Sequence, residues 1–165
     1  MPAPTPHLDL ASIDLTRVVA DLDAIEQVIP QRHEMLQLSA IVHVDTAHHL
    51  IVGYKDVTAD EFWVRGHFPG HPFLPGVLMC ESAAQLTCYY NLSNKVTKGA
   101  LIGLGGIENG RFRRAVVPGD RLVLVGKGLK VRSRLTHFDV QGFVNGDLAF
   151  SVEIIGVVLV KGYEG

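Results

Sequence analysis

The sequence has few of the residues that mark specialised classes of protein. Its 165 residues include two cysteines and one tryptophan, and no apolar run reaches the roughly 20 residues that a bilayer-spanning helix needs. The formal net charge of −2 leaves no excess of positive charge for nucleic acid. The N-terminus carries Asp9 and Asp14 and lacks the basic and then apolar pattern of a secretory signal. We therefore expect a cytoplasmic protein with no membrane span and no nucleic-acid partner.

The composition predicts a single folded domain. Apolar residues make up 47% of the chain, which excludes disorder and suits one sizeable core. Three early prolines predict a loose tail over residues 1 to about 14. From Leu15 the apolar spacing becomes helical, with Asp14 as a candidate N-cap and Pro30 as a stop. We divide the chain into a tail and leading helix at 1–24 and one domain at 25–165.

The chain centres on the stretch from His67 to Gln85, which reads HFPGHPFLPGVLMCESAAQ. Prolines and glycines crowd its first half and predict a fixed loop without helix. From Pro75 onward the residues are almost uniformly apolar and contain no helix breaker, which predicts a helix buried on all sides. Cys80 and Cys88 would lie about 12 Å apart on this helix. That separation excludes a disulfide between them, and we interpret both as small buried apolar residues.

Glu81 is the only charged residue between Gly66 and Asn94. A lone carboxylate on a buried helix is costly unless it has a partner or stays protonated. It could be a polar core residue satisfied by Ser82 or by Gln85, one turn further on. Its isolation favours a functional role.

Two histidines, His67 and His71, flank the proline-rich loop and could suggest a metal site with Glu81 or Cys80. The intervening prolines and glycine exclude the helix that would place both imidazoles on one face. We therefore predict no metal site here.

The stretch HFPGHPFLPGVLMCESAAQ resembles the signature of the β-hydroxyacyl-acyl-carrier-protein dehydratases, which have the hotdog fold. In that family the histidine is the catalytic base, and a glutamate fourteen positions later is its acidic partner. Those positions are His67 and Glu81 here. The related dehydratase-isomerases carry aspartate at the acid position, so Glu81 favours the plain dehydratase branch.

The resemblance implies removal of water from a (3R)-3-hydroxyacyl thioester to give a trans-2-enoyl thioester, without metal or organic cofactor. An oxyanion donor is expected at the backbone N–H of Gly76, where the free N–H groups of a helix N-terminus also point. We assign further oxyanion or substrate contacts to Val77, Phe68 and Gln85. Members of the family are homodimers with shared active sites, often paired further into hexamers.

A second match to the family is RFRRAVVPGDRL at residues 111–122. It opens a basic segment, and acyl carrier proteins are acidic. A candidate docking surface for the carrier therefore comprises Arg111, Arg113, Arg114, Arg132 and Arg134. The alternative is a solvated outer face of a sheet.

The remaining patterns predict mainly antiparallel strands. Residues 40–45, 50–58 and 148–160 have strand character, and Asn145-Gly146 is a strong hairpin turn. Glycines at 103, 105 and 106 indicate either a ligand near a strand or a bulged edge. One long helix among such strands is an α+β fold. The resemblance makes it a hotdog fold, an antiparallel sheet wrapped around one long central helix.

The family pattern is weakest at Pro30–Ser39, where this chain keeps only Pro30, Arg32 and Leu36. A different acyl group is one consequence that this departure suggests. Two other functions stay open from sequence alone: a hotdog acyl-thioesterase, and a non-catalytic acyl-binding homologue. The same chemistry could also serve a specialised lipid or polyketide pathway rather than fatty acid synthesis.

Overall fold

The computed structural model describes residues 4–97 and 101–160. Its framework is one six-stranded antiparallel sheet with the order β1-β2-β4-β5-β6-β3. The strands are β1 (Ala40–Asp45), β2 (Leu50–Asp56), β3 (Leu101–Phe112), β4 (Arg121–Val131), β5 (Leu135–Val144) and β6 (Asp147–Val160). The predicted α+β fold is confirmed, and the strands expected at 40–45, 50–58 and 148–160 lie where they were predicted.

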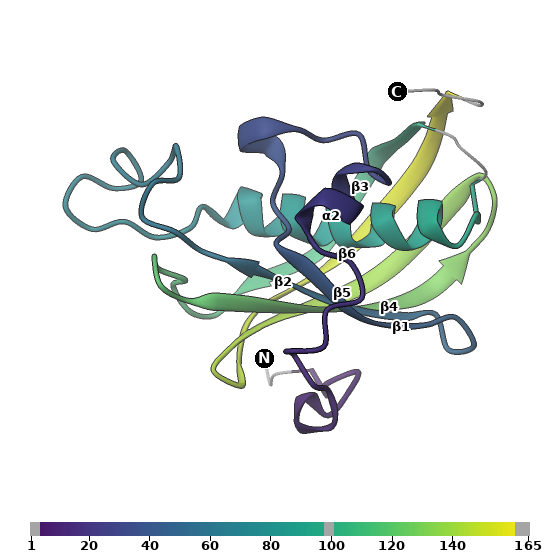
Figure 1. Cartoon of the computed structure of the whole chain (residues 1–165), viewed down its shortest axis with the longest axis horizontal. Helices are drawn as coiled ribbons and strands as arrows, with labels where there is room; N and C mark the ends of the chain where they lie inside the picture. Colours follow the sequence, from purple (N-terminus) through teal and green to yellow (C-terminus); the bar gives the residue numbers. More distant parts are fainter. Residues whose placement is uncertain (1–3, 98–100, 161–165) are drawn as a thin grey trace.

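The long helix α2 (Gly76–Ser93) lies across one face of this sheet (Figure 1). It is apolar on all sides because the sheet and the N-terminal segment enclose it, and Ala83 and Leu86 are fully buried. Gly53 of β2 allows the close approach, since a Cβ there would lie 2.9 Å from a Leu86 methyl group. Across the described residues, no helix combines the length and apolar character needed to cross a bilayer.

The turn between β5 and β6 is the predicted two-residue hairpin. Asn145 and Gly146 both have positive φ angles, of 53° and 85°. Glycine and asparagine tolerate this conformation, which matches the twist of the flanking strands. The tight turn sets the register that places Phe150, Val152 and Ile154 against the helix.

The N-terminal predictions were wrong in part. The helix α1 spans only Leu22–Glu26 and is capped by Asp21, whose carboxylate accepts a hydrogen bond from the Ala24 N–H. Residues 15–19 form turns and bends instead, and the backbone of residues 19 and 20 pairs with Ile41 at the edge of β1, where Ala20 forms a β-bridge. Because these backbone groups pair with the sheet edge, they are not available to form a helix.

The described part of the tail, residues 4–14, is also more ordered than predicted. It includes the short 3-10 helix η1 (Leu10–Ser12) and runs along the sheet face opposite α2 (Figure 1). Leu8, Leu10 and Ile13 cover a second apolar cluster on that face. The apolar residues of β1 and β2 therefore have apolar partners on both faces of the sheet, and the tail covers the outer face.

The glycines of β3 fit the bulged-edge alternative. Side chains added at Gly103 and Gly105 would collide with Leu159 and Val157 of β6, at 2.4 and 2.7 Å. The β3–β6 register also shifts between Leu104 and Gly106. Strand β3 is an outer strand of the sheet and exposes Leu104, Ile107 and Phe112.

Candidate active site

The loop that carries His67 joins β2 to α2 and is tied to the body at both ends. The Val57 N–H donates to the Asp120 carbonyl, and the Leu74 N–H donates to the Val116 carbonyl. Both partners belong to the segment between β3 and β4, which contains Pro118-Gly119-Asp120. The second family motif, at residues 111–122, thus holds the loop that carries His67 in place through these hydrogen bonds.

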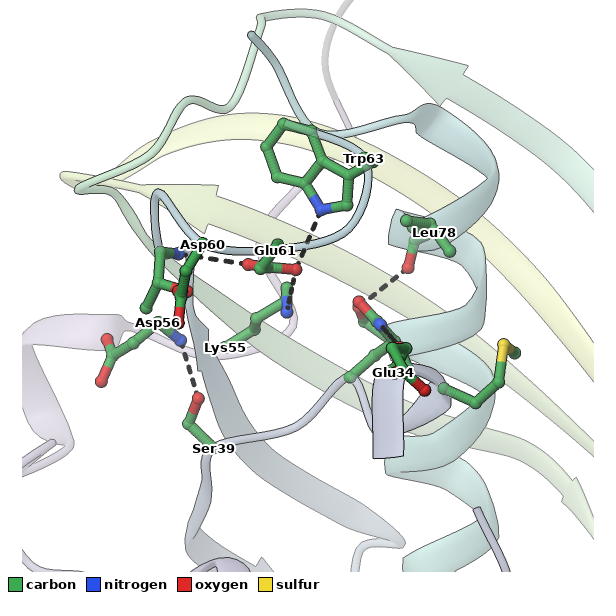
Figure 2. A network of polar contacts seen from close by, with 12 residues as sticks. Glu34, Ser39, Lys55, Asp56, Asp60, Glu61, Trp63 and Leu78 are labelled. Atoms are coloured by element: carbon green, nitrogen blue, oxygen red, sulfur yellow. Dashed lines mark hydrogen bonds and ion pairs between the residues drawn. The ribbon is translucent and has the colours of Figure 1, made fainter. Parts of the chain in front are cut away.

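A buried ion pair stabilises the first half of this loop. The Lys55 ammonium lies 2.9 Å from the Glu61 carboxylate, with side-chain exposures of 7% and 13%. The same carboxylate accepts hydrogen bonds from the Trp63 indole N–H at 2.9 Å and the Thr58 N–H at 3.1 Å. Figure 2 shows Glu61 between Lys55 and Trp63. These extra donors compensate the cost of burying the charges.

Trp63 links this network to the catalytic candidate. The Trp63 carbonyl accepts a hydrogen bond of 2.8 Å from the His67 N–H. The position of His67 therefore depends on Lys55 through Glu61 and Trp63. The sequence analysis did not predict this role, although Glu61 belongs to the segment Val-Thr-Ala-Asp-Glu at residues 57–61, directly before the loop.

The His67 ring is held in one tautomer. Its Nδ1 lies 2.8 Å from the Phe73 carbonyl, and a carbonyl can only accept, so Nδ1 carries the proton. In neutral His67 the other nitrogen, Nε2, is then a free base, and it has no hydrogen-bond partner among the described residues. Phe68, itself half exposed, stacks on the ring at 4.3 Å between centroids, and Phe73 packs edge-on at 5.1 Å.

The N-terminus of α2 follows directly after the loop. Pro75 stands at the N-cap position and supplies no side-chain cap. The Pro75 carbonyl accepts from the N–H groups of residues 78 and 79, while those of Gly76 and Val77 have no partner in the described structure. Two adjacent free N–H groups at a helix N-terminus can stabilise a developing oxyanion.

Gly76 lies close to the aromatic ring of Phe112. A Cβ there would lie 3.0 Å from the Phe112 ring, so the neighbouring aromatic side chain limits the position directly. Val77 is 76% exposed.

Glu81 lies in the second turn of α2 and is half buried. Its Oε1 accepts a 2.8 Å hydrogen bond from the Gln85 amide. Gln85 is fully buried, and its amide also donates to the Met35 carbonyl and accepts from the Gln37 N–H. Because its hydrogen-bonding groups are used within the chain, Gln85 is better placed to orient Glu81 than to contact substrate.

Glu81 opens onto a cavity of about 110 Å³ between α2 and the β3–β6 edge of the sheet. Ala84 and Cys88, which follow Glu81 on the same helix face, line it. Burial, followed by the Glu81 charge, raises the pKa of the Cys88 thiol to about 12. The thiol is therefore neutral and acts as an apolar wall. Both cysteines are free and buried, as predicted.

A larger cavity, of about 570 Å³, lies between residues 33–39 and the start of the loop. Its lining includes Lys55 and Glu61 but neither His67 nor Glu81. Of the two predicted catalytic residues, Glu81 lines the smaller cavity and His67 lines neither.

Within the described chain, no hydrogen bond or ion pair joins His67 to Glu81. His67 stays in the loop before α2, and Glu81 faces the cavity beside β3. Among the described residues, one set of His, Cys, Asp and Glu side chains is compact enough for a metal, and it is Glu108, His137 and Glu153. These residues come from three strands of the sheet, and the set includes neither His67, His71 nor Glu81.

The predicted basic docking surface does not form one patch. Arg111, Arg113 and Arg114 follow the end of β3 that pairs with Phe150, near Gly76 and the catalytic loop. Arg132 and Arg134 lie in the β4–β5 turn, next to the start of β5 at Leu135, which pairs with Val157. Seven residues of β6 separate the two positions, or about 23 Å of strand. The two groups therefore lie at opposite ends of the sheet.

Comparison with known proteins identifies the family. A FabA-like domain model matches residues 29–153. The 3-hydroxyacyl-[acyl-carrier-protein] dehydratase FabZ of Desulforamulus reducens is 37% identical over 135 residues, which is 82% of this chain and 94% of that protein. The chain belongs to the FabZ dehydratase family. The FabZ protein of Streptococcus gordonii is 36% identical over 131 residues, covering 79% of this chain and 92% of its own length.

Solved structures support the fold of this FabZ family member. The dehydratase heterocomplex ApeI:P from Xenorhabdus doucetiae matches with a TM-score of 0.69 over 81% of this chain and 90% of that one, at 17% identity. This likeness confirms the predicted hotdog fold. His67 and Glu81 both lie inside the matched family region, whereas residues 1–28, with the tail that covers the outer sheet face, precede it.

Proposed function

We propose that this protein dehydrates (3R)-3-hydroxyacyl groups on acyl carrier protein to trans-2-enoyl groups in fatty acid biosynthesis. Membership of the FabZ family carries the proposal, with identity of about 35% over most of the chain. The site geometry supports it, because it presents a free imidazole nitrogen, a lone carboxyl group and two unpaired N–H groups. These are the groups that the elimination of water requires.

In the proposed mechanism His67 Nε2 removes a proton from C2 of the acyl chain. The electron pair of that C–H bond forms the C2=C3 double bond, while the C3–O bond breaks. Glu81 gives its proton to the departing hydroxyl, which leaves as water. His67 ends protonated and Glu81 ends ionised, and proton exchange with water restores both. Such acid and base steps are each worth about 10²–10⁴-fold in rate.

The N–H groups of Gly76 and Val77 stabilise the thioester oxygen as it gains negative charge. They are fixed by the first turn of α2, so they need no reorganisation during the reaction. The hydrogen bond from Gln85 to Glu81 Oε1 leaves Oε2 as the oxygen that can carry a proton toward the substrate. Gln85 is thus a positioning residue for the acid.

The active site is shared between two subunits in this proposal. Within the described chain no hydrogen bond or ion pair joins His67 to Glu81. The outer strand β3 exposes Leu104, Ile107 and Phe112, and Leu104 lines the Glu81 cavity. Pairing of two β3 strands would bury these side chains and satisfy the strand edges. It would also bring the cavity of one subunit to the other.

The carrier protein docks, in this proposal, on the basic group nearest the loop. Arg111, Arg113 and Arg114 lie near the start of α2, whereas Arg132 and Arg134 lie about 23 Å away. Reversing the charge of Arg111 should raise KM for the carrier thioester and leave KM for a pantetheine thioester unchanged. Equal KM values for the carrier thioester in Arg111→Glu and Arg132→Glu would refute this choice of surface.

The experiment that tests the function is hydration of crotonyl thioesters, followed at the enoyl absorbance. His67→Ala and Glu81→Gln should each lower kcat at least 100-fold. The matched controls are His71→Ala in the same loop and Ser82→Ala on the same helix. Release of free thiol without hydration would instead establish the thioesterase alternative. Cell fractionation would test the proposed cytoplasmic location.

A further inference from the structure

The outer face of the sheet, opposite α2, carries a row of carboxylates on three adjacent strands. Glu108 of β3 lies opposite Glu153 of β6, and Glu153 lies opposite Asp139 of β5. Val152 and Ile154 belong to the core on the helix side, so Glu153 between them points to the other face. Because like charges directly opposite each other destabilise a sheet, the row favours positive charge close to it.

Two of the three carboxylates have a histidine as partner. Asp139 lies 3.0 Å from the His7 Nε2 of the N-terminal tail. The Glu153 Oε2 lies 2.6 Å from the His137 Nε2. Glu108 is exposed and has no hydrogen bond or ion pair in the described part of the chain.

Two arginines follow Glu108 in the sequence, but they make other contacts. Arg111 donates to the Gly110 carbonyl at 2.7 Å, and Arg113 donates to the Ser151 hydroxyl at 2.9 Å. Neither pairs with Glu108 within residues 4–97 and 101–160. Compensation of the Glu108 charge thus depends on His137, which Glu153 already contacts, or on a cation from solution.

The donor atoms of Glu108, His137 and Glu153 are close enough to share one ion, since they all lie within 4.8 Å of one another. One imidazole nitrogen and two carboxylate oxygens are ligands that zinc accepts, and its bonds of about 2.1 Å place neighbouring ligand atoms about 3.4 Å apart. Rotation of the exposed Glu108 side chain can bring the atoms to that spacing. The ion would replace the proton that His137 and Glu153 share.

The surroundings of Glu153 suit a metal ligand. The Asn109 amide donates a 2.7 Å hydrogen bond to Oε1, which orients the carboxylate and leaves Oε2 toward His137. Asn109 and Glu153 also line a cavity of about 340 Å³. This cavity provides an entry path for the ion and room for its water ligands.

We propose that Glu108, His137 and Glu153 bind one zinc ion, which joins the outer strand β3 to β6 and β5. The imidazole favours zinc over magnesium or calcium, which prefer ligand sets of oxygen alone. The three ligands are far apart in the sequence, so their spacing gave no sign of the site. The proposal is independent of the dehydratase function, because the ion would lie on the sheet face opposite α2 and Glu81.

The test is calorimetric titration of the tag-free, full-length protein with zinc chloride after treatment with a chelator. We expect one zinc ion per chain and no comparable binding of magnesium. Thermal unfolding should shift upward by roughly 5–10 °C at free zinc of about 100 times Kd. Absence of zinc binding, as expected if His137 only bridges the two carboxylates as a cation, would overturn the proposal, and so would equal binding of magnesium.

Variants locate the ion. Glu108→Gln and His137→Ala should each weaken zinc binding by more than about tenfold, and Asn109→Ala by about tenfold. Glu108→Gln should fold like the wild type, because the Glu108 side chain is exposed. Unchanged zinc affinity in folded Glu108→Gln would overturn the assignment.

His48→Ala is the matched control. His48 lies 2.7 Å from Asp45 and forms the same kind of histidine–carboxylate pair, but it does not belong to the compact set of three ligands. Its replacement should leave zinc affinity and the thermal shift unchanged. Loss of zinc binding in His48→Ala or in His67→Ala, with binding retained in His137→Ala, would place the ion elsewhere and overturn the proposal.

Discussion

The Gln85 side chain offers a sharp test of how the acid is positioned. Replacing it with methionine keeps its length and volume but removes every hydrogen bond that the amide makes. Those bonds join Glu81 Oε1 at 2.8 Å, the Met35 carbonyl at 2.5 Å and the Gln37 N–H at 2.8 Å. The change leaves the peptide of Gln37 without a partner in a place where that residue is only 2% exposed.

The expected effect on stability follows from those losses. A buried group left without a hydrogen-bond partner costs about 1–3 kcal/mol. The Gln37 N–H and the Glu81 carboxyl both lose partners, so Gln85→Met should lower the free energy of unfolding by about 2–4 kcal/mol. The variant should still fold, since a typical domain has about 5–15 kcal/mol of stability.

The effect on activity should exceed what lost stability explains. With no donor on Oε1, the Glu81 carboxyl can rotate, and kcat for crotonyl hydration should fall about 10–100-fold, within the usual worth of a positioned acid.

Ser82→Ala serves as the control for Gln85→Met. Ser82 is buried on the same helix and donates only to the Leu78 carbonyl, so its loss should affect stability but leave kcat unchanged. Urea unfolding and stopped-flow hydration on both variants give the two quantities. A folded Gln85→Met protein with wild-type kcat would refute the positioning role.

Three other changes test other parts of the structure. Lys55→Met leaves the buried Glu61 without its counter-charge, so it should lower the free energy of unfolding by about 3 kcal/mol and also lower kcat. Urea unfolding and hydration rates measure the two effects. Between about pH 9 and 12 the Cys88 thiol should ionise only in the unfolded chain. The free energy of unfolding of the wild type should therefore fall by roughly 1.4 kcal/mol more per pH unit than that of Cys88→Ala. An equal loss of stability in both proteins between pH 8 and 10, measured by urea unfolding, would contradict this. Leu104→Lys should give a monomeric, inactive protein by light scattering and activity assay, because it places a charge on the proposed β3 interface; a fully active dimer would argue against that interface.

The sequence was most informative where one local rule decides the structure. The absence of breakers after Pro75 predicted α2, and Asn145-Gly146 predicted the hairpin with its register. The N-terminal helix failed because the spacing of Leu15, Val18 and Val19 satisfies a helix, but the backbone of residues 19 and 20 pairs with Ile41 instead. A contact with a strand more than twenty residues away has no trace in local spacing.

In the candidate site, too, some features can be predicted from local sequence and others depend on distant contacts. His67 and Glu81 stand out in sequence because a conspicuous loop and a lone charge mark them. Other features depend on distances that only the folded chain provides. These are the tautomer of His67, the contacts that link Lys55 through Glu61 to Trp63, and the hydrogen bonds of Gln85 within the chain. The split of the basic residues likewise follows from strand pairing and not from their closeness in sequence.

The measurement that bears most directly on the central claim is a subunit complementation assay. His67→Ala and Glu81→Gln are purified as inactive homodimers, mixed to exchange subunits, and assayed for crotonyl hydration. A site that takes His67 from one subunit and Glu81 from the other predicts that mixed dimers recover activity, since half of their sites keep both wild-type residues. If the mixture stays inactive while the wild type hydrates crotonyl thioesters and subunit exchange is complete, the account of the shared site is wrong.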